Sequence, residues 1–289
     1  MSNVIEKRPP RKAAKKRRNI MKRFLALLLA VIMVLGLAAC GGSKTSTTTT
    51  PEPTPAAKKF IHGFDLDYPP YSFLNDDGTV GGFDVELAQA VCDYLGWEYE
   101  PLPFNWDAKD AELNAGSCDC IWSGFTVEGR EDDYTWSIAY SNNDQMIMVP
   151  ENSDIKTLED LAGKVVGVQT ATSAYDLLTD GDQVDLYKTF KKLEVYETYT
   201  IAFNDLQAGA IDAIAIDVTS GNFLMSNVSG YKFLDTVLGA ETYAIGFRKG
   251  DTELCQQVND ALMALVENGT YDAIGQKYPD IYDYLCLGK

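Results

Sequence analysis

The chain has 289 residues, 46% of them hydrophobic, and its 25 Lys and Arg residues face 42 Asp and Glu residues, giving a formal net charge of −17. This is the composition of a globular protein with one large or two ordinary domains, and it excludes a collagen-like or wholly disordered chain. The acidic balance argues against nucleic acid as a partner, because contacts to phosphates need clustered Lys and Arg. The single histidine, His62, excludes most histidine-dependent catalysis and histidine-rich metal sites, and we expect no metal and no other cofactor.

The charge is unevenly distributed along the chain. Residues 1–39 hold ten of the bases and only one of the acids, so the rest of the chain has a net charge of −26. Residues 24–39 form an uncharged run that is short for a membrane span, which needs about 20 residues. Placed behind Lys22 and Arg23, the run fits the apolar core of a secretory signal peptide. The sequence leaves open whether translation starts at Met1 or Met21.

The apolar run ends in small residues directly before Cys40. This junction resembles the lipobox of bacterial lipoproteins, which implies cleavage before Cys40 and a diacylglyceryl group on its sulfur. An uncleaved anchor with an incidental cysteine is the alternative. Residues 41–57 are small, polar and Pro-rich, which predicts a flexible linker. We therefore expect a signal peptide with a basic N-terminal extension at 1–39, a lipidated cysteine and linker at 40–57, and an extracytoplasmic protein held at the cell membrane.

From residue 58 onward, short apolar runs alternate with amphipathic stretches. Strands are predicted at 60–64 and 120–122. Between them we expect one helix that begins at Asp84 and ends at Gly96, and another that begins at Asp107 and ends at Gly116, each with an aspartate N-cap and a glycine C-cap. This alternation is typical of α/β layers around a mainly parallel sheet.

The same alternation then starts again. Thr157 and Asp160 have the spacing of a capping box at the start of a short helix. Further strands are predicted at 164–168, 193–196 and 213–216, with helices between them and a long helix at 252–268. The chain thus has two similar α/β halves. In open α/β sheets, ligands bind at the carboxyl ends of the strands, so a cleft between the halves would be lined by the residues at those ends.

Five cysteines follow Cys40, and disulfides between them are permitted outside the cell. An odd number leaves at least one thiol free, and the sequence does not determine the connectivity. Cys118 and Cys120 form a weak metal-binding pattern, and buried structural cysteine is the favoured interpretation. The five residues are Cys92, Cys118, Cys120, Cys255 and Cys286.

Four motifs stand in a characteristic order. They read DLDYPPYSF (65–73) with GGFD (81–84), DCIWSGFT (119–126) with GRE (129–131), GVQTATSA (167–174) and GAIDAIAID (209–217). Their order and spacing resemble the bacterial extracellular solute-binding proteins of family 3, which receive polar amino acids for ABC importers. The resemblance covers about residues 58–279.

This resemblance implies a two-lobed fold of the type II periplasmic-binding-protein class, with the ligand cleft between the lobes. Two segments of chain, near 142–146 and 238–243, would cross from one lobe to the other. Lobe one would then comprise 58–142 plus 243–289, and lobe two 146–238.

The resemblance also implies a site for an amino-acid zwitterion. Arg130 would clamp the carboxylate, for which its planar fork is suited, although it comes one position earlier than in many relatives. Thr172 and Ser173, at the start of a helix, would hold the same carboxylate through backbone N–H groups. Asp217, at the end of an apolar strand, would pair with the ammonium group. Taken alone, the Thr-Ser pair is equally well explained as an ordinary N-cap.

Further ligand contacts are implied at seven positions. Two aromatic residues would form walls, although lone aromatics are more often core residues. Asp84 is better explained as an N-cap than as a ligand contact, and Asp144 would face either the cleft or solvent. The seven positions are Asp65, Tyr68, Trp106, Ser123, Gly124, Thr126 and Gln169.

The expected function is therefore the capture of a free polar amino acid, with basic ones among the candidates, by hinge closure. The protein would act as a monomer and deliver its ligand to the membrane permease of an ABC transporter. A cleft enzyme similar to cyclohexadienyl or arogenate dehydratases, a ligand-sensing module and an adhesin on the same scaffold are the alternatives. The sequence leaves open which amino acid is bound and how tightly.

Overall fold

The computed structural model describes residues 57–75 and 77–289, and these residues form one compact unit. The predicted signal peptide at 1–39, the lipidation of Cys40 and the linker up to residue 56 lie outside the described residues. These features therefore stay predictions.

The first sheet has five strands in the order β5-β1-β6-β14-β7. β1 pairs in parallel with β5 and β6, whereas β14 pairs antiparallel with β6 and β7. A small antiparallel sheet of β2, β3 and β4 lies next in the chain to β1. The bounds of these strands are β1 (Lys59–Asp65), β2 (Asp67–Tyr68), β3 (Ser72–Leu74), β4 (Val80–Gly81), β5 (Glu98–Phe104), β6 (Cys120–Ile121), β7 (Thr135–Trp136) and β14 (Gly246–Phe247).

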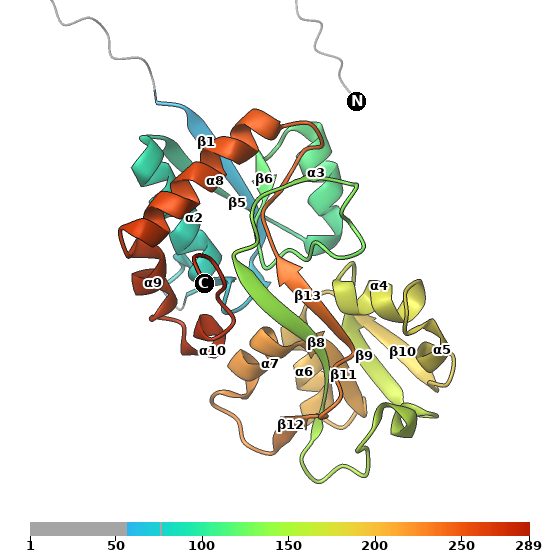
Figure 1. Cartoon of the computed structure of the whole chain (residues 1–289). Helices are drawn as coiled ribbons and strands as arrows, with labels where there is room; N and C mark the ends of the chain where they lie inside the picture. The colour runs from blue at the N-terminus through green and yellow to red at the C-terminus, as the bar shows by residue number, and fades with distance from the viewer. Residues whose placement is uncertain (1–56, 76) are drawn as a thin grey trace, which may run out of the picture. The chain divides into compact units, whose positions relative to one another are not determined.

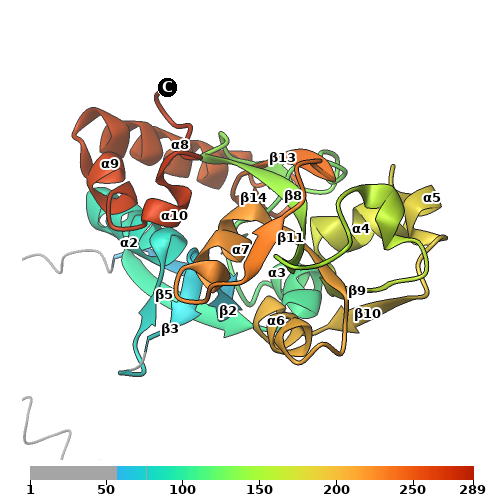
Figure 2. The ribbon, with the colours of Figure 1, turned by 90° about the horizontal axis from the view of Figure 1, so that it is seen from below.

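Helices from both ends of this part of the chain pack together beside the first sheet. α2 contacts both α8 and α9, which come much later in the sequence (Figures 1 and 2). The bounds are α2 (Phe83–Leu95), the 3₁₀ helix η1 (Trp106–Ala108), α3 (Lys109–Ala115), α8 (Thr252–Glu267), α9 (Thr270–Gly275) and α10 (Pro279–Tyr282). We call this group of helices, the first sheet and the small sheet lobe one.

The second sheet has six strands, ordered β10-β9-β11-β8-β12 with β13 also paired to β8. β9 is parallel to β10 and β11, and β8 is antiparallel to β11, β12 and β13. We call this sheet and its helices lobe two. Its elements are β8 (Ser141–Pro150), η2 (Leu158–Leu161), β9 (Val165–Gln169), α4 (Ser173–Thr179), α5 (Val184–Tyr187), β10 (Lys192–Tyr196), α6 (Tyr199–Gln207), β11 (Ala213–Asp217), α7 (Val218–Met225), β12 (Tyr231–Phe233) and β13 (Gly239–Tyr243).

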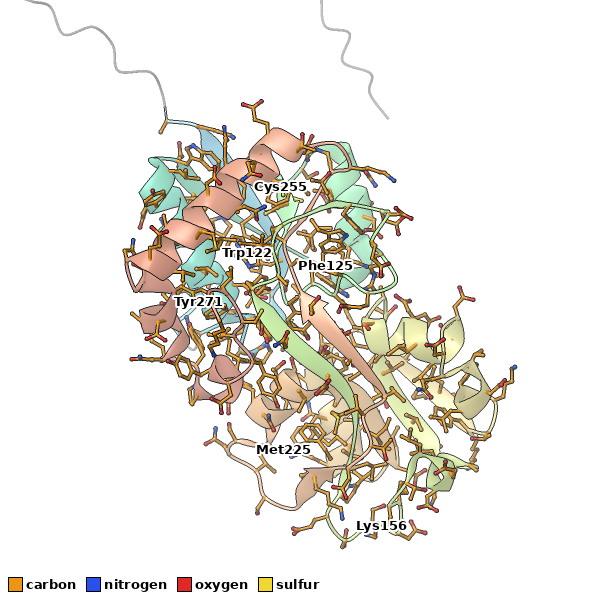
Figure 3. The ribbon with its side chains drawn as sticks, viewed as in Figure 1. Trp122, Phe125, Lys156, Met225, Cys255 and Tyr271 are labelled. Carbon is orange, nitrogen blue, oxygen red and sulfur yellow. The ribbon has the colours of Figure 1, made fainter. Side chains whose placement is uncertain are left out.

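The chain passes between the two sheets along β8 and β13, which run side by side as an antiparallel pair (Figure 1). β8 follows β7 of the first sheet, and β13 leads into β14 of that sheet. The segments predicted as crossings, 142–146 and 238–243, overlap these strands, and the boundaries proposed for the lobes stay a prediction. Trp122, Phe125 and Tyr271 lie among the side chains of lobe one, and Lys156 and Met225 lie in lobe two (Figure 3).

Local signals at helix ends are confirmed in part. Gly96 and Gly116 end α2 and α3 in the left-handed conformation, as predicted. The capping box of Thr157 and Asp160 is present at η2. These three signals depend only on residues within a few positions of one another, which is why sequence reasoning found them.

The two predicted aspartate N-caps are wrong. The N-cap of α2 is Gly82, whose φ of 117° suits glycine and where a Cβ would lie 2.2 Å from the carbonyl oxygen of Tyr71. Asp84 lies inside the helix and turns its carboxylate to other partners. Asp107 lies within η1, so that α3 begins after it with Ala108 as its N-cap.

The described residues contain no disulfide among the five cysteines that follow Cys40, and all but Cys286 are buried. Residues 57–75 and 77–289 contain no group of three or more His, Cys, Asp and Glu side chains placed to hold a metal ion. Within the same ranges, no helix has the length and apolar character needed to cross a bilayer.

Candidate functional site

A small cavity lies between lobe one and lobe two, and the space that the side chains leave in it is about 20 Å³, close to what a single water molecule needs. All eleven residues predicted to contact a ligand line it, together with Phe125, which was not predicted; the ligand-binding role of the eleven stays a prediction. The lining residues are Asp65, Tyr68, Trp106, Ser123, Gly124, Phe125, Thr126, Arg130, Gln169, Thr172, Ser173 and Asp217.

Strand ends supply the polar residues of both walls. Asp65 is the last residue of β1, Gln169 the last of β9 and Asp217 the last of β11. Because β1 and β9 belong to different sheets, the carboxyl ends of two sheets face each other across the cavity. This is the position at which open α/β sheets bind ligands.

Direct hydrogen bonds join the lobes beside the cavity. Gln169 Nε2 donates to Asp65 Oδ2 at 2.9 Å, and Thr200 Oγ1 of α6 donates to Asp67 Oδ1 at 2.8 Å. Trp106 Nε1 donates to the carbonyl oxygen of Ala171 at 3.0 Å. Since each bond has one partner in lobe one and the other in lobe two, the lobes are held together around the cavity.

Arg130 brings a positive charge to the cavity wall. Its side chain is 12% exposed, and its guanidinium lies 5.6 Å from the centre of the Phe125 ring. Nη1 donates to the carbonyl oxygen of Thr126 at 3.4 Å, and Nη2 pairs with Asp176 Oδ2 of α4 at 2.5 Å. A guanidinium has five N–H donors, so donors remain for a carboxylate in the cavity. Sequence reasoning did not find Asp176, because it lies far from Arg130 in the chain.

The start of α4 forms the opposite wall. Thr172 is its N-cap, accepting from the Tyr175 N–H at 3.3 Å and donating to the carbonyl oxygen of Gln169 at 2.8 Å. The ordinary capping interpretation is thus correct for Thr172, and it is compatible with a ligand role. Ser173 is the first helical residue, where backbone N–H groups have no partner within the helix. These donors favour an anion at this end of the cavity.

Asp217 is buried and accepts three hydrogen bonds on a single oxygen. Asn143 Nδ2, Gln145 Nε2 and the Tyr243 hydroxyl donate to Oδ1 at 2.8, 2.5 and 2.5 Å. Oδ2 has no hydrogen-bond partner among the described residues. A buried carboxylate oxygen without a donor is costly, so this atom marks a place for a positively charged group or another donor.

The donors to Asp217 also serve Glu241 of β13. Asn143 Nδ2 and Gln145 Nε2 donate to Glu241 Oε1 at 2.6 and 2.8 Å. Burial, followed by the charge of Asp217, raises the pKa of Glu241 to about 8. Sequence reasoning did not identify Glu241, Asn143 or Gln145 as site residues, because it assigned the stretches around 241 and 143 only to the predicted crossings between the lobes.

Two further buried acids differ in their relation to the cavity. Asp65 lines it, and burial raises its pKa to about 6. Asp84 does not line it; its Oδ2 accepts from the Gly124 N–H at 2.7 Å and from the Tyr140 hydroxyl at 2.8 Å, and burial raises its pKa to about 7. Asp84 therefore fixes the backbone at Gly124, a cavity-lining residue, without lining the cavity itself. Asp144 is half-buried and lies outside the cavity lining.

The sequence matches the family model of bacterial extracellular solute-binding proteins, family 3, over residues 60–280. The chain is 30% identical over 221 residues to the L-cystine-binding protein TcyJ of Escherichia coli (strain K12), which covers 75% of this chain and 80% of that protein. The curated relatives reported with it are amino-acid-binding proteins.

Solved structures agree in fold. A substrate-binding protein of an ABC uptake transporter from Streptococcus pneumoniae, with bound histidine, has a TM-score of 0.74 and 31% identity, covering 78% of this chain and 94% of that one. An ancestral amino acid-binding protein, described as a precursor of cyclohexadienyl dehydratase, has a TM-score of 0.69 and 30% identity, covering 76% and 95%. These neighbours are type II periplasmic-binding proteins, so the predicted fold class is confirmed.

Members of the family act outside the cytoplasm, and the relatives above are named for binding rather than for catalysis. The family match spans most of the chain and includes all four motifs from which the resemblance was first drawn. The chain therefore belongs to the bacterial extracellular solute-binding proteins, family 3.

Proposed function

We propose that this protein is a lipid-anchored extracytoplasmic receptor that captures one free amino acid between its lobes and delivers it to the permease of an ABC transporter. The observation that carries the proposal is the charge arrangement of the cavity. One wall presents the guanidinium of Arg130, and another presents Oδ2 of buried Asp217, which has no hydrogen-bond partner in the described part of the chain. An amino-acid zwitterion has one group for each.

The ligand carboxylate would lie between Arg130 of lobe one and the start of α4 in lobe two. The guanidinium supplies charge-assisted hydrogen bonds, and the first N–H groups of the helix supply additional donors. The ammonium group would lie against Asp217 Oδ2. Charged groups removed from water need such partners, so the arrangement selects for a zwitterion over a neutral molecule.

The ligand side chain would extend toward Asp65 and Gln169. Asp65 is a carboxyl group, and Gln169 Oε1 is a buried acceptor without a partner in the described residues. Acceptors of this kind favour a polar side chain that carries N–H or O–H donors, and basic amino acids are included. Tyr68 and Trp106 would form the flanking walls, with Ser123, Gly124 and Thr126 lining the lobe-one side.

Hinge closure follows from the placement of these groups. Because a ligand held by Arg130 and Asp217 touches both lobes, it stabilises a closed arrangement through contacts that an open one lacks. β8 and β13 are the segments about which the lobes would rotate. The monomer would then present the closed lobes to the permease.

A thermal-shift screen with the twenty amino acids and L-cystine tests the binding function. A ligand at 100 times its Kd adds about 2.7 kcal/mol to the free energy of unfolding, which such a screen resolves. We expect one or a few related amino acids to raise the Tm, and the shift to be lost in Asp217→Asn. If no amino acid stabilises the wild-type protein, the proposed function is wrong.

The lipid anchor is tested separately in cells. We expect the wild-type protein to incorporate a labelled fatty acid and to sediment with membranes, and Cys40→Ser to do neither. Equal membrane association of both forms would contradict the anchor without affecting the binding function.

We infer that the protein is a binding protein and not a cleft enzyme. One structural neighbour is described as a precursor of a dehydratase, so the enzymatic alternative has a definite assay. Incubation with prephenate and with arogenate should leave both compounds unchanged beyond the buffer control. Protein-dependent product formation would favour the enzyme.

A further inference from the structure

Two buried acids share one pair of amide donors behind the cavity. β8 lies between β11 and β13, with Gln145 opposite Asp217 on one side and Asn143 opposite Glu241 on the other. Each amide nitrogen donates to both acids, over distances of 2.5 to 2.8 Å. Asn143 is fixed in this orientation because its Oδ1 accepts from the Thr219 hydroxyl at 3.0 Å.

Among the described residues, no basic side chain forms an ion pair with either of the two acids. Glu241 is 5% exposed, and it faces Asp217 of β11, Tyr243 of β13, Tyr199 of α6 and Ser173 of α4.

Arg130, a cation of the cavity wall, has other partners. Arg130 lines a surface groove that Glu241 also touches, but its guanidinium is bonded to Asp176 and to the Thr126 carbonyl.

Each acid also keeps one oxygen without a partner. Asp217 Oδ2 and Glu241 Oε2 are both buried and accept no hydrogen bond from the described residues. Two carboxylates at such a site cannot both ionise without strong repulsion, so one of them holds a proton. Burial and the charge of Asp217 favour Glu241 as the holder, because they raise its pKa to about 8.

We propose that Glu241 is a specificity-determining positioning residue of the amino-group site, which binds a cationic primary amine at Asp217 and releases the Glu241 proton as that amine arrives. The inference rests on the proposed function, which places the ligand ammonium at Asp217. The step is a simple ionisation. The O–H bond of the Glu241 carboxyl breaks, the electron pair stays on the oxygen, and the proton passes to water or buffer.

The physical reason is charge compensation. An ammonium at Asp217 Oδ2 offsets the negative charge that holds Glu241 neutral, so the cost of ionising Glu241 falls. The ionised carboxylate then accepts stronger hydrogen bonds from Asn143 and Gln145, across the strands that link the lobes. A hydroxyl in place of the amine brings no such charge, and the site therefore discriminates for amines.

Calorimetry in two buffers of different ionisation enthalpy counts the released protons. With L-arginine, L-lysine and L-cystine as probes, we expect the wild-type protein to release roughly one proton more per bound ligand than Glu241→Gln at pH 7, and this difference to vanish above about pH 9, where Glu241 is already ionised. Glu241→Gln keeps an acceptor and a similar shape, so it should bind without this additional release. Equal release in the two proteins at pH 7 overturns the inference alone.

If neither these probes nor any amino acid of the thermal-shift screen binds, the proposed function is wrong, and this inference, which rests on it, is wrong as well. The pH profile of the wild-type protein needs no variant, so the test stands even if Glu241→Gln does not fold. A purely structural role for Glu241 would lower affinity equally at every pH and would leave the proton count unchanged.

A second measurement needs no ligand. The folded protein raises the pKa of Glu241 above its ordinary value of 4.5 to about 8. The stability gained from holding that proton is complete below the ordinary pKa and is lost as the pH rises through the folded one. We expect the free energy of unfolding of the wild-type protein to fall, relative to Glu241→Gln, between about pH 5 and pH 8. Parallel pH curves would overturn the inference.

Discussion

At the scale of single residues, Arg130 and Asp217 carry the opposite charges on which binding is proposed to depend. They come from different lobes, and each faces the cavity with unused hydrogen-bonding capacity. Removal of either would leave the opposing ligand charge without its partner in a site closed to water. The effect is therefore larger than that of deleting an exposed ion pair.

Arg130→Ala and Asp217→Asn should each weaken amino-acid binding by at least about 2 kcal/mol, which is roughly thirtyfold in Kd. Titration calorimetry with the amino acid found by thermal shift measures the loss. Asp185→Asn is the matched control, because Asp185 is an exposed residue of α5 that pairs with Lys188 on the surface. Wild-type affinity in either cavity variant would remove that residue from the site.

Asp84 gives a prediction about pH. Its pKa is raised from 3.8 to about 7, so the folded state holds a proton that the unfolded state releases above about pH 4. The stability that comes from this proton is lost as the pH rises through 7. Asp84→Asn should keep the contacts to Gly124 and Tyr140 and gain stability relative to the wild-type protein as the pH rises from 4 to 7. Urea denaturation at several pH values measures the difference in the free energy of unfolding between the two proteins. A difference that stays the same at every pH would contradict the prediction.

At the scale of elements, the loop from β9 to α4 carries an unusual backbone. Ala171 has a φ of 55°, which is in the left-handed region that favours glycine. This conformation aims its carbonyl oxygen at lobe one, where it accepts from Trp106 Nε1 at 3.0 Å and Lys109 Nζ at 3.4 Å. The loop therefore holds a strained residue at a point of contact between the lobes.

Ala171→Gly should leave the free energy of unfolding unchanged or raise it, because glycine adopts this conformation without strain. Ala171→Val should lower it by at least about 1 kcal/mol, since a β-branched side chain is least tolerated there. Chemical denaturation measures both. Ala174→Gly in α4 is the control, because the same change in a helix should destabilise by roughly 1 kcal/mol. A destabilised Ala171→Gly would contradict the strain argument.

The elements also show which features of the fold and the site could be predicted from the sequence. The capping box at Thr157 and the strand-end residue Asp217 were predictable, because caps act over a few residues and strand ends follow hydrophobic runs. The N-cap assignment of Asp84 failed because a tertiary partner, Gly124, competes for its side chain. Glu241 and Asn143 were missed because antiparallel pairing of β8 with β13 brings them together.

At the scale of the whole molecule, contacts outside the cavity lining also join the lobes. Lys109 of α3 is buried, and its ammonium donates to the Ala171 carbonyl of lobe two without lining the cavity. Burial lowers its pKa, so the charged form is disfavoured in the folded protein. Lys109 thus supports the closed arrangement without contributing to the proposed ligand contacts.

Lys109→Met should weaken amino-acid binding by roughly threefold to tenfold, as expected for the loss of about one hydrogen bond from the closed state. The free energy of unfolding should not fall, because methionine buries the same volume without a charge. Calorimetry and urea denaturation separate the two effects. Lys188→Met on the exposed face of α5 is the control. An unchanged Kd in Lys109→Met would show that this contact has no part in closure.

The strands of the first sheet come from distant parts of the chain, and this affects the order in which the protein folds. Its strand β6 pairs with β14, and all of lobe two lies between these strands in the chain. Lobe two is continuous in sequence from β8 to β13, so its contacts close over shorter loops and can form earlier. Until β14 arrives, Cys120 and Ile121 leave an apolar strand edge unpaired, which is a template for aggregation. A nascent molecule is therefore most vulnerable after its second lobe has folded and before its first is complete.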